Sequence, residues 1–303
     1  MQAISVHGLH KSYGDTDAVR GISFDVAPGE VFGLLGANGA GKTTTVEILE
    51  GYRARSAGEV RVLGADPGRP ARSWRERIGL VLQECELDHS LTVRETVTLF
   101  ASFYPRPRRV DETIALAGLA PKRDALVGSL SGGERRRVDV ALGIVGDPDL
   151  LFLDEPTTGF DPAARRDAWT MIDGLRELGK TIVLTTHYMD EAQRLADRVA
   201  IMRAGELIAT GTVEEIGRTL GSEIVIRFRL PGGVPVRIVA SEVQTPVEAS
   251  GSEATIRTPD PQRVLYRLTG WAERERYRLA GLEVVRPRLD DMFLELMTED
   301  GDG

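Results

Sequence analysis

The sequence predicts an α/β domain with a mostly parallel sheet, followed by a smaller α+β domain. Two segments that alternate apolar and polar residues, Ile4–Leu9 and Ile22–Val26, predict an antiparallel subdomain near the start of the chain. Helical periodicity from Thr92 to Arg137 predicts a helical subdomain at about 84–147. Four short, mainly apolar runs are typical of parallel strands buried on both faces: Val31–Leu35, Ile78–Leu82, Leu150–Leu153 and Thr181–Thr186.

The second domain is predicted to begin near Gly221, so we expect domains at residues 1–220 and 221–303. Ile224–Leu230 alternates strictly, which is typical of a strand, and Pro231–Gly233 makes a turn, after which strands and two short helices are expected to continue to Met297. This part of the chain has no glycine loop and no cluster of carboxylates with histidine. We therefore expect a regulatory or docking role, with simple stabilisation as the alternative. Residues 299–303 are expected to be disordered.

The composition limits the class of protein. At 303 residues and 42% hydrophobic content, the chain can form ordinary cores. A formal net charge of -8 argues against nucleic acid as the main partner, because that partner needs a broad basic face. One cysteine excludes an internal disulfide and a multi-cysteine metal site. The N-terminus lacks signal-peptide features and no segment has the length to span a bilayer, so we expect a cytosolic protein for which any membrane role needs a separate partner.

A glycine-rich segment, Gly36–Thr44, follows the apolar run Val31–Leu35. Its spacing fits G-x-x-x-x-G-K-[ST], in which backbone N–H groups wrap nucleotide phosphates and the next helix points its N-terminus at the same anion. We expect Lys42 to neutralise the β and γ phosphates and Thr43 to ligate magnesium. The alternative is a glycine-rich turn between a strand and a helix. The order of strand, loop and helix favours a P-loop NTPase core.

Two carboxylates, Asp154 and Glu155, follow the run Leu150–Leu153. The C-terminal end of a parallel strand reaches the ligand edge of the sheet. Asp154 is placed to hold the magnesium shell, and Glu155 to accept a proton from the water that attacks the γ-phosphate. The alternative is a polar strand end without a role, but a P-loop already calls for an acidic strand end of this kind.

Three further residues each have a functional and a structural interpretation. Tyr13 lies between the two N-terminal strands and can stack on adenine or pack at a strand end. Gln83 ends a strand and can contact magnesium and the attacking water, or lie at the surface. His187 ends another strand and can hydrogen-bond the γ-phosphate, or be an ordinary polar residue there. The residues alone leave these alternatives open.

A second glycine pair occurs in Leu130–Glu134, at the start of the helix that carries Arg135–Arg137. Ser131 is a good N-cap, and two glycines at a helix N-terminus make a second anion-binding surface. The alternative is a capped helix with a solvated basic first turn, and the residues alone favour neither.

In this order, these segments resemble the nucleotide-binding subunits of ABC transporters, from Ile4 to Gly217. By this resemblance, Gly36–Thr44 corresponds to the Walker A loop and Leu150–Asp154 to the Walker B strand. Gln83 corresponds to the Q-loop residue, which implies catalytic and magnesium contacts, and Glu155 to the catalytic base.

Leu130–Glu134 is similar to the family signature, and we call it the signature loop. Asp161 corresponds to the D-loop acid and His187 to the switch histidine, while Glu134 and Phe160 replace the commoner glutamine and leucine without removing a phosphate ligand. The resemblance implies nucleotide contacts from these residues: Tyr13, Gly36, Asn38, Gly39, Gly41, Lys42, Thr43, Thr44, Ser131, Gly132, Gly133, Glu134 and Asp161.

The resemblance also implies partners. Two copies pair head to tail, so that Ser131 and Gly133 of one copy cap the γ-phosphate held by Lys42 of the other, with ATP and Mg²⁺ between them. The segment Glu84–Leu91 contacts a separate membrane permease, and the chain lies peripherally on the cytoplasmic face of the membrane. The segment Arg288–Leu296 is similar to drug-resistance-type exporters, which implies export.

Two other functions stay open from the sequence. An ABC-type ATPase that acts on ribosomes or DNA is disfavoured, because such proteins usually join two ATPase halves or add coiled coils or zinc clusters. A regulatory protein that binds ATP without hydrolysing it is disfavoured by the presence of Glu155 and His187. The cargo and the permease are not encoded in any residue pattern of this chain.

Overall fold

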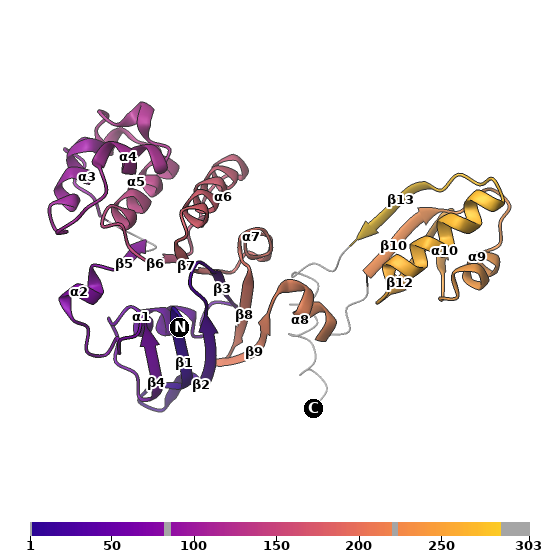
Figure 1. Ribbon diagram of the computed structural model, residues 1–303, viewed down its shortest axis with the longest axis horizontal. Helices are drawn as coiled ribbons and strands as arrows, with labels where there is room; N and C mark the ends of the chain where they lie inside the picture. Colours follow the sequence, from indigo (N-terminus) through magenta and orange to yellow (C-terminus); the bar gives the residue numbers. More distant parts are fainter. Residues whose placement is uncertain (1, 82–85, 220–223, 286–303) are drawn as a thin grey trace. The chain divides into compact units, whose positions relative to one another are not determined.

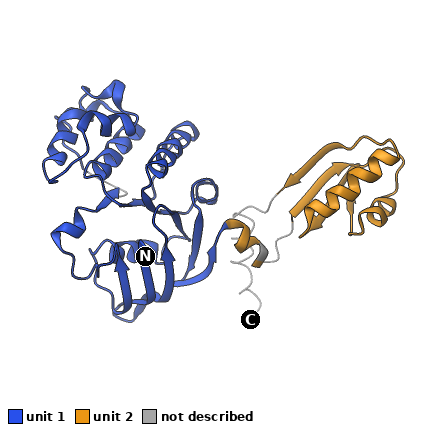
Figure 2. Ribbon diagram, in the orientation of Figure 1, with its two compact units in different colours: residues 1–212 blue, residues 213–303 orange. Residues whose placement is uncertain are grey.

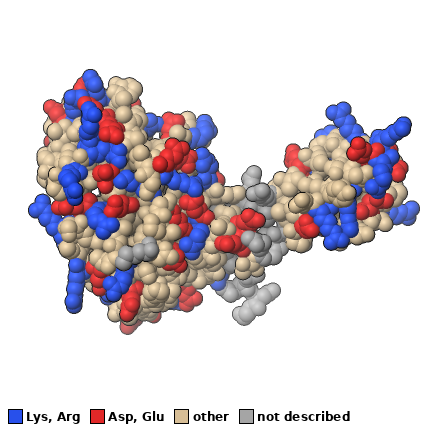
Figure 3. Space-filling view, viewed as in Figure 1, with Lys and Arg blue, Asp and Glu red and all other residues tan. Residues whose placement is uncertain are grey.

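The computed structural model describes residues 2–81, 86–219 and 224–285, in two compact units (Figures 1 and 2). The first unit covers Met1–Thr212 and the second Val213–Gly303, so the division lies a few residues ahead of the expected boundary. No helix in the described ranges is long and apolar enough to cross a membrane. On the face shown in Figure 3, basic and acidic side chains are interspersed in both units.

A six-stranded sheet forms the centre of the first unit. Its strands lie in the order β5 (Ile78–Val81), β6 (Leu150–Asp154), β7 (Thr181–Thr186), β3 (Val31–Leu35), β8 (Arg198–Arg203) and β9 (Glu206–Gly211). Five strands are parallel and β9 pairs antiparallel with β8, which confirms the mostly parallel sheet. Because β6, β7 and β3 are neighbours, the residues that follow their C-terminal ends meet at one edge of the sheet.

A second, antiparallel sheet has the order β2 (Thr16–Val26), β1 (Ile4–Tyr13) and β4 (Ala57–Val62), as the alternating N-terminal segments predicted. It shares a hydrophobic core with the central sheet, where the rings of Phe24 and Phe32 stack at 5.3 Å between centroids. Helix α1 (Lys42–Leu49) follows β3 directly, with Ile48 and Leu49 buried in the same core.

The helical subdomain is built from α3 (Val93–Ala101), α4 (Val110–Leu116) and α5 (Gly132–Ile144), which lie together in Figure 1. Pro105 and Pro107 fall between α3 and α4, as predicted. The subdomain has its own core, in which Val97, Ile114 and Val138 are almost fully buried. The remaining helices of this unit are α2 (Arg72–Arg75), α6 (Pro162–Glu177) and α7 (Met189–Leu195), with 3-10 turns at Ala120–Lys122 and Val127–Ser129.

The second unit is an antiparallel sheet packed on two helices, so it has the predicted α+β architecture. The strand order is β11 (Glu248–Ser250), β12 (Glu253–Thr258), β10 (Ile224–Arg229) and β13 (Ala280–Val285). Helices α9 (Val236–Val243) and α10 (Pro261–Arg274) bury Val239, Leu268 and Trp271 against Phe228 and Ile256. Helix α8 (Val213–Thr219) precedes the sheet, and Arg288–Leu296 lies outside the described residues.

Candidate nucleotide site

The P-loop wraps the N-terminus of α1 in a backbone conformation that only glycine adopts freely. Gly41 is the N-cap residue, with φ of 101° and no side-chain cap, so the first N–H groups of α1 are left for a ligand. A Cβ at Gly36 would lie 2.4 Å from the carbonyl oxygen of Met202, and one at Gly41 would lie 2.5 Å from that of Ala18. The loop is therefore closed against β2 and β8 by glycine alone.

Lys42 lies beneath this loop with only 6% of its surface exposed. Its Nζ donates to the carbonyl oxygens of Gly36 at 2.7 Å and Ala37 at 3.2 Å. Burial lowers the pKa of Lys42, while the charges of Glu155 and Asp154 act against that shift. Within the described residues this buried ammonium donates to carbonyl oxygens alone, so it is well placed to exchange them for phosphate oxygens.

The other predicted P-loop residues surround this lysine. Thr43 is exposed and Thr44 half-buried in the first turn of α1, and Asn38 and Gly39 are exposed at the tip of the loop. These positions leave hydroxyl and N–H groups accessible to an anion above the helix.

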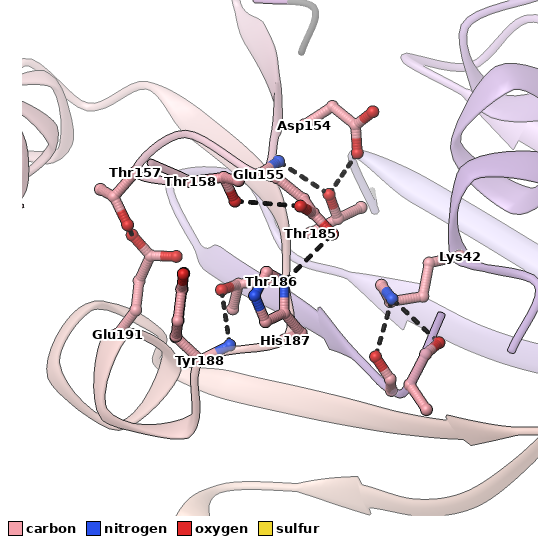
Figure 4. A network of polar contacts seen from close by, with 12 residues as sticks. Lys42, Asp154, Glu155, Thr157, Thr158, Thr185, Thr186, His187, Tyr188 and Glu191 are labelled. Atoms are coloured by element: carbon pink, nitrogen blue, oxygen red, sulfur yellow. Dashed lines mark hydrogen bonds and ion pairs between the residues drawn. The ribbon is translucent and has the colours of Figure 1, made fainter. Parts of the chain in front are cut away.

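Asp154 and Glu155 leave β6 beside β7, and both are held by Thr185 (Figure 4). The Thr185 hydroxyl donates to Asp154 Oδ1, and the Glu155 N–H donates to the Thr185 carbonyl oxygen at 3.1 Å and Oγ1 at 3.0 Å. These bonds cross from one strand end to the next, so the two carboxylates keep a fixed relation to the sheet edge.

The Glu155 carboxylate is clamped from two sides (Figure 4). His187 Nδ1 lies 3.2 Å from Glu155 Oε1, and the Thr158 hydroxyl donates to Oε2 at 2.9 Å. The His187 ring packs on Tyr188 at 4.1 Å between centroids. The structure thus brings together Lys42, Glu155 and His187, which come from three separate segments of the sequence.

The signature loop lies on a different part of the first unit. Ser131 caps α5: its Oγ accepts from the Glu134 N–H at 3.2 Å, and Glu134 Oε2 accepts from the Ser131 N–H at 2.9 Å. A hollow of about 320 Å³ is lined there by Ser131, Gly133, Glu134 and Asp161. Within the described residues, its lining includes no residue of the P-loop or of the Glu155 clamp.

Three predicted residues have other outcomes. Tyr13 is the last residue of β1, and 41% of its surface is exposed, so it is not a buried strand-end residue. Its ring centroid lies 4.8 Å from Lys11 Nζ and 5.3 Å from the Arg53 guanidinium. Asp161 caps α6, where its Oδ1 accepts from Ala163 and Ala164 N–H groups and these bonds lower its pKa. Gln83 lies outside the described residues.

Comparison with known proteins decides the family. Residues 19–158 match the family model described as ABC transporter, and residues 225–287 match the C-terminal domain of ABC transporter domain-containing protein-like sequences. The Nod factor export ATP-binding protein I of Rhizobium sp. (strain N33) is 41% identical over 305 residues, which cover 97% of this chain and 96% of the relative. The chain belongs to the ABC transporter ATP-binding proteins.

Other matches agree with this membership. The Nod factor export ATP-binding protein I of Paraburkholderia xenovorans (strain LB400) is 42% identical, over 97% of this chain and 96% of the relative's length. The solved structure of CbiO1 from Clostridium perfringens, part of the ABC transporter complex CbiONQ, is 31% identical with a TM-score of 0.66, covering 72% of this chain and 91% of that one. A solved ATP-binding subunit of an ABC transporter is 26% identical with a TM-score of 0.65, covering 73% and 94%.

As a member of this family, the protein is an ATPase subunit of an ABC transporter. These matches give no support to the alternative of a ribosome- or DNA-associated ATPase.

This ABC ATPase also has site residues that the sequence analysis missed. Thr185 and Thr158 hold the two carboxylates, and Arg136 of α5 donates to the Asp154 carbonyl oxygen at 2.8 Å. One signal for Arg136 was available: it lies four residues before Val140 and eight before Ile144, which are both buried, so the helix period places it on the buried face.

A larger hollow of about 540 Å³ lies between the end of α1 and the helical subdomain. Trp74, Phe100 and Tyr104 give it apolar walls, and Glu50 and Asp139 also line it. Burial raises the pKa of Glu50 to about 8 and that of Asp139 to about 6. None of the residues predicted to bind nucleotide lines this hollow in the described part of the ABC ATPase.

Proposed function

We propose that two copies of this chain bind ATP and magnesium head to tail and hydrolyse ATP to power export by a separate membrane permease. The observation that carries the proposal is the Glu155 clamp. An acidic side chain with 14% of its surface exposed is held 3.2 Å from His187, at the sheet edge it shares with buried Lys42. A fixed carboxylate beside a phosphate site is the arrangement that a general base requires.

The residues present fit a magnesium ion. The Thr43 hydroxyl and the Asp154 carboxylate are the hard oxygen ligands that Mg²⁺ takes, and Mg²⁺ completes its shell with water and phosphate oxygens. No group of three or more histidine, cysteine or acidic residues that could hold a metal occurs in the described residues. A magnesium ion that binds together with the nucleotide needs only one or two protein ligands, because phosphate oxygens and water fill the other positions of its shell. When bound, the ion supplies charge neutralisation at the β and γ phosphates.

The chain's own residues then have separate roles. Lys42 and the α1 N-terminus bind and orient the phosphates, and Glu155 accepts the proton of the attacking water. His187 holds the Glu155 carboxylate, and we expect it to sense the γ-phosphate. Ser131 and Gly133 of a second copy close the site, because the signature loop of one copy lies at a separate surface hollow.

Replacement of Glu155 tests the hydrolytic role. In Glu155→Gln, ATP binding should persist while turnover falls at least a hundredfold, since an amide cannot accept the proton. Glu177→Gln, at the exposed end of α6, is the matched control and should keep wild-type turnover. Phosphate release and nucleotide affinity are measured on both. Undiminished hydrolysis in Glu155→Gln would show that Glu155 is not the base.

The partner is tested by purification from native membranes. We expect the chain to co-purify with a multispan permease and to lie peripherally on the cytoplasmic face. The relatives are named for Nod factor export, and we propose export for this chain as well, with the cargo selected by the permease. Co-purification with ribosomes or DNA instead would favour a non-transport ATPase.

A further inference from the structure

The backbone at Glu155 is in an unusual conformation. Its φ is 44°, in the left-handed region that residues other than glycine seldom adopt. Such a conformation persists only where the surroundings hold it from several sides. Thr185 holds one side, since its carbonyl oxygen and hydroxyl both accept from the Glu155 N–H.

Arg136 holds the other side. It projects from α5, with 8% of its surface exposed. Its Nη2 donates to the carbonyl oxygen of Asp154 at 2.8 Å, and its Nε donates to that of Pro156 at 3.4 Å. These two carbonyls belong to the residues immediately before and after Glu155. One guanidinium therefore spans the strained position.

The geometry points to Arg136 as a positioning residue for Glu155, and as the link between the signature loop and the base of the same chain. Arg136 lies five residues after Ser131 on one helix, so a movement of the α5 N-terminus is carried to the carbonyls beside Glu155. This inference rests on the proposed role of Glu155 as the base.

The fork geometry of arginine is needed here. A guanidinium carries its donors on separate nitrogens in a rigid plane, so Nε and Nη2 bond the two carbonyls that flank Glu155, whereas the three donors of a lysine ammonium share one nitrogen on a flexible stem. Arg136→Lys keeps the positive charge and most of the buried volume, but it loses the simultaneous contact with Asp154 and Pro156. This variant separates the positioning role from the charge.

Arg136→Lys is tested in the full-length protein by three measurements. We expect turnover at saturating ATP to fall at least tenfold, while ATP affinity stays within threefold of wild type. Hydrogen exchange in peptides that cover 154–160 should be faster, with no change in peptides from 4–26. Arg77→Lys is the matched control, because Arg77 pairs with Asp149 at the opposite end of β6 and should leave turnover and exchange unchanged.

The following results would overturn the positioning role of Arg136. Wild-type turnover, or unchanged exchange at 154–160, in Arg136→Lys overturns the inference. A parallel loss of turnover and ATP affinity, with faster exchange throughout the first unit, also overturns it, because it shows a general structural role. The exchange measurement needs no hydrolysis, so it stands even if the proposed function fails. That failure is recognised separately, by full activity of Glu155→Gln.

Discussion

Two loops of this protein place glycines at a helix N-terminus, and they are built in opposite ways. At the P-loop, Gly41 caps α1 without a side chain, and the loop closes on Lys42 inside the protein. At the signature loop, Ser131 and Glu134 form a complete capping box. The P-loop leaves its helix N–H groups for a ligand, whereas the signature loop satisfies two of its own.

The glycines themselves differ in the same way. Gly36 and Gly41 have positive φ and no room for a Cβ, so the fold of this chain requires them. A Cβ at Gly132 would meet nothing within 4 Å, and one at Gly133 would lie 3.7 Å from the Cβ of Ala164, which is ordinary contact. The fold of one chain does not require the signature glycines. If they are needed, the requirement comes from a ligand or a second copy that approaches the surface.

Gly41→Ala is the largest expected effect and tests the first half of this comparison. The new Cβ would lie 2.5 Å from the Ala18 carbonyl oxygen in β2, at a φ of 101°. We expect a loss of about 3 kcal/mol in the free energy of unfolding of the first unit, together with loss of ATP binding. Urea unfolding and nucleotide titration measure the two effects.

Gly39→Ala is the control for that experiment. Gly39 has a φ of 82° but open space around its Cβ position, so the stability loss should be smaller than at Gly41. Equal stability losses in the two variants would contradict the claim that the close approach to β2 is what demands glycine.

Gly133→Ala tests the other half of this comparison, that the fold of one chain does not require the signature-loop glycines. Alanine favours a helix over glycine by up to about 1 kcal/mol, so stability should be unchanged or slightly higher. ATP binding by the single chain should also stay the same, but turnover should fall more than tenfold, because the Cβ intrudes where the partner's γ-phosphate would sit. Gly174→Ala, in the last turn of α6 with nothing within 4 Å of its Cβ position, should keep full turnover.

Mixing gives a sharper version of the Gly133 experiment. Gly133→Ala and Lys42→Ala chains, each with strongly reduced turnover alone, should recover part of the turnover when combined, since one of the two shared sites then has an intact P-loop and an intact signature loop. Full activity of Gly133→Ala alone would remove the reason to place a second copy at this surface.

The sequence predicted what depends on local order. The buried runs predicted strands of the central sheet, and the spacing of Gly36, Gly41 and Lys42 predicted the loop that joins β3 to α1 and lies close against β2 and β8. Asp154, Glu155 and His187 were predicted because each follows a strand end, and neighbouring parallel strands bring such ends to one edge.

Other features of the site were not predicted, because they depend on tertiary contacts or on a capping pattern at the signature loop. Thr185 and Arg136 support Glu155 from another strand and another helix, which no spacing in the sequence connects. Glu134 was assigned to the nucleotide, yet serine followed three residues later by glutamate is the pattern of a capping box, and in the structure Glu134 bonds to Ser131 and lies 3.3 Å from Lys122 Nζ. Its nucleotide contact stays a prediction.

Glu50 extends the comparison to the other end of the P-loop helix. It is the C-cap residue of α1, where the helix dipole also disfavours a negative charge. Burial raises its pKa from 4.5 to about 8, and the charges of Asp154 and Glu47 add to that shift. The folded protein therefore keeps a proton that the unfolded chain releases. Between pH 4.5 and about 8 the unfolded state binds fewer protons, so this residue lowers stability as the pH rises through that window.

Glu50→Gln should remove this pH dependence and has the smallest expected effect of the series. Glutamine has nearly the same shape and no charge to desolvate, so the free energy of unfolding should rise at pH 8.5, with little change at pH 4.5. Urea unfolding at the two pH values measures it. Glu177→Gln, which is exposed at the end of α6, should behave alike at both. A gain of equal size at pH 4.5 and pH 8.5 would mean that packing, and not the buried proton, explains the result, and the P-loop helix would then carry no titrating group at its far end.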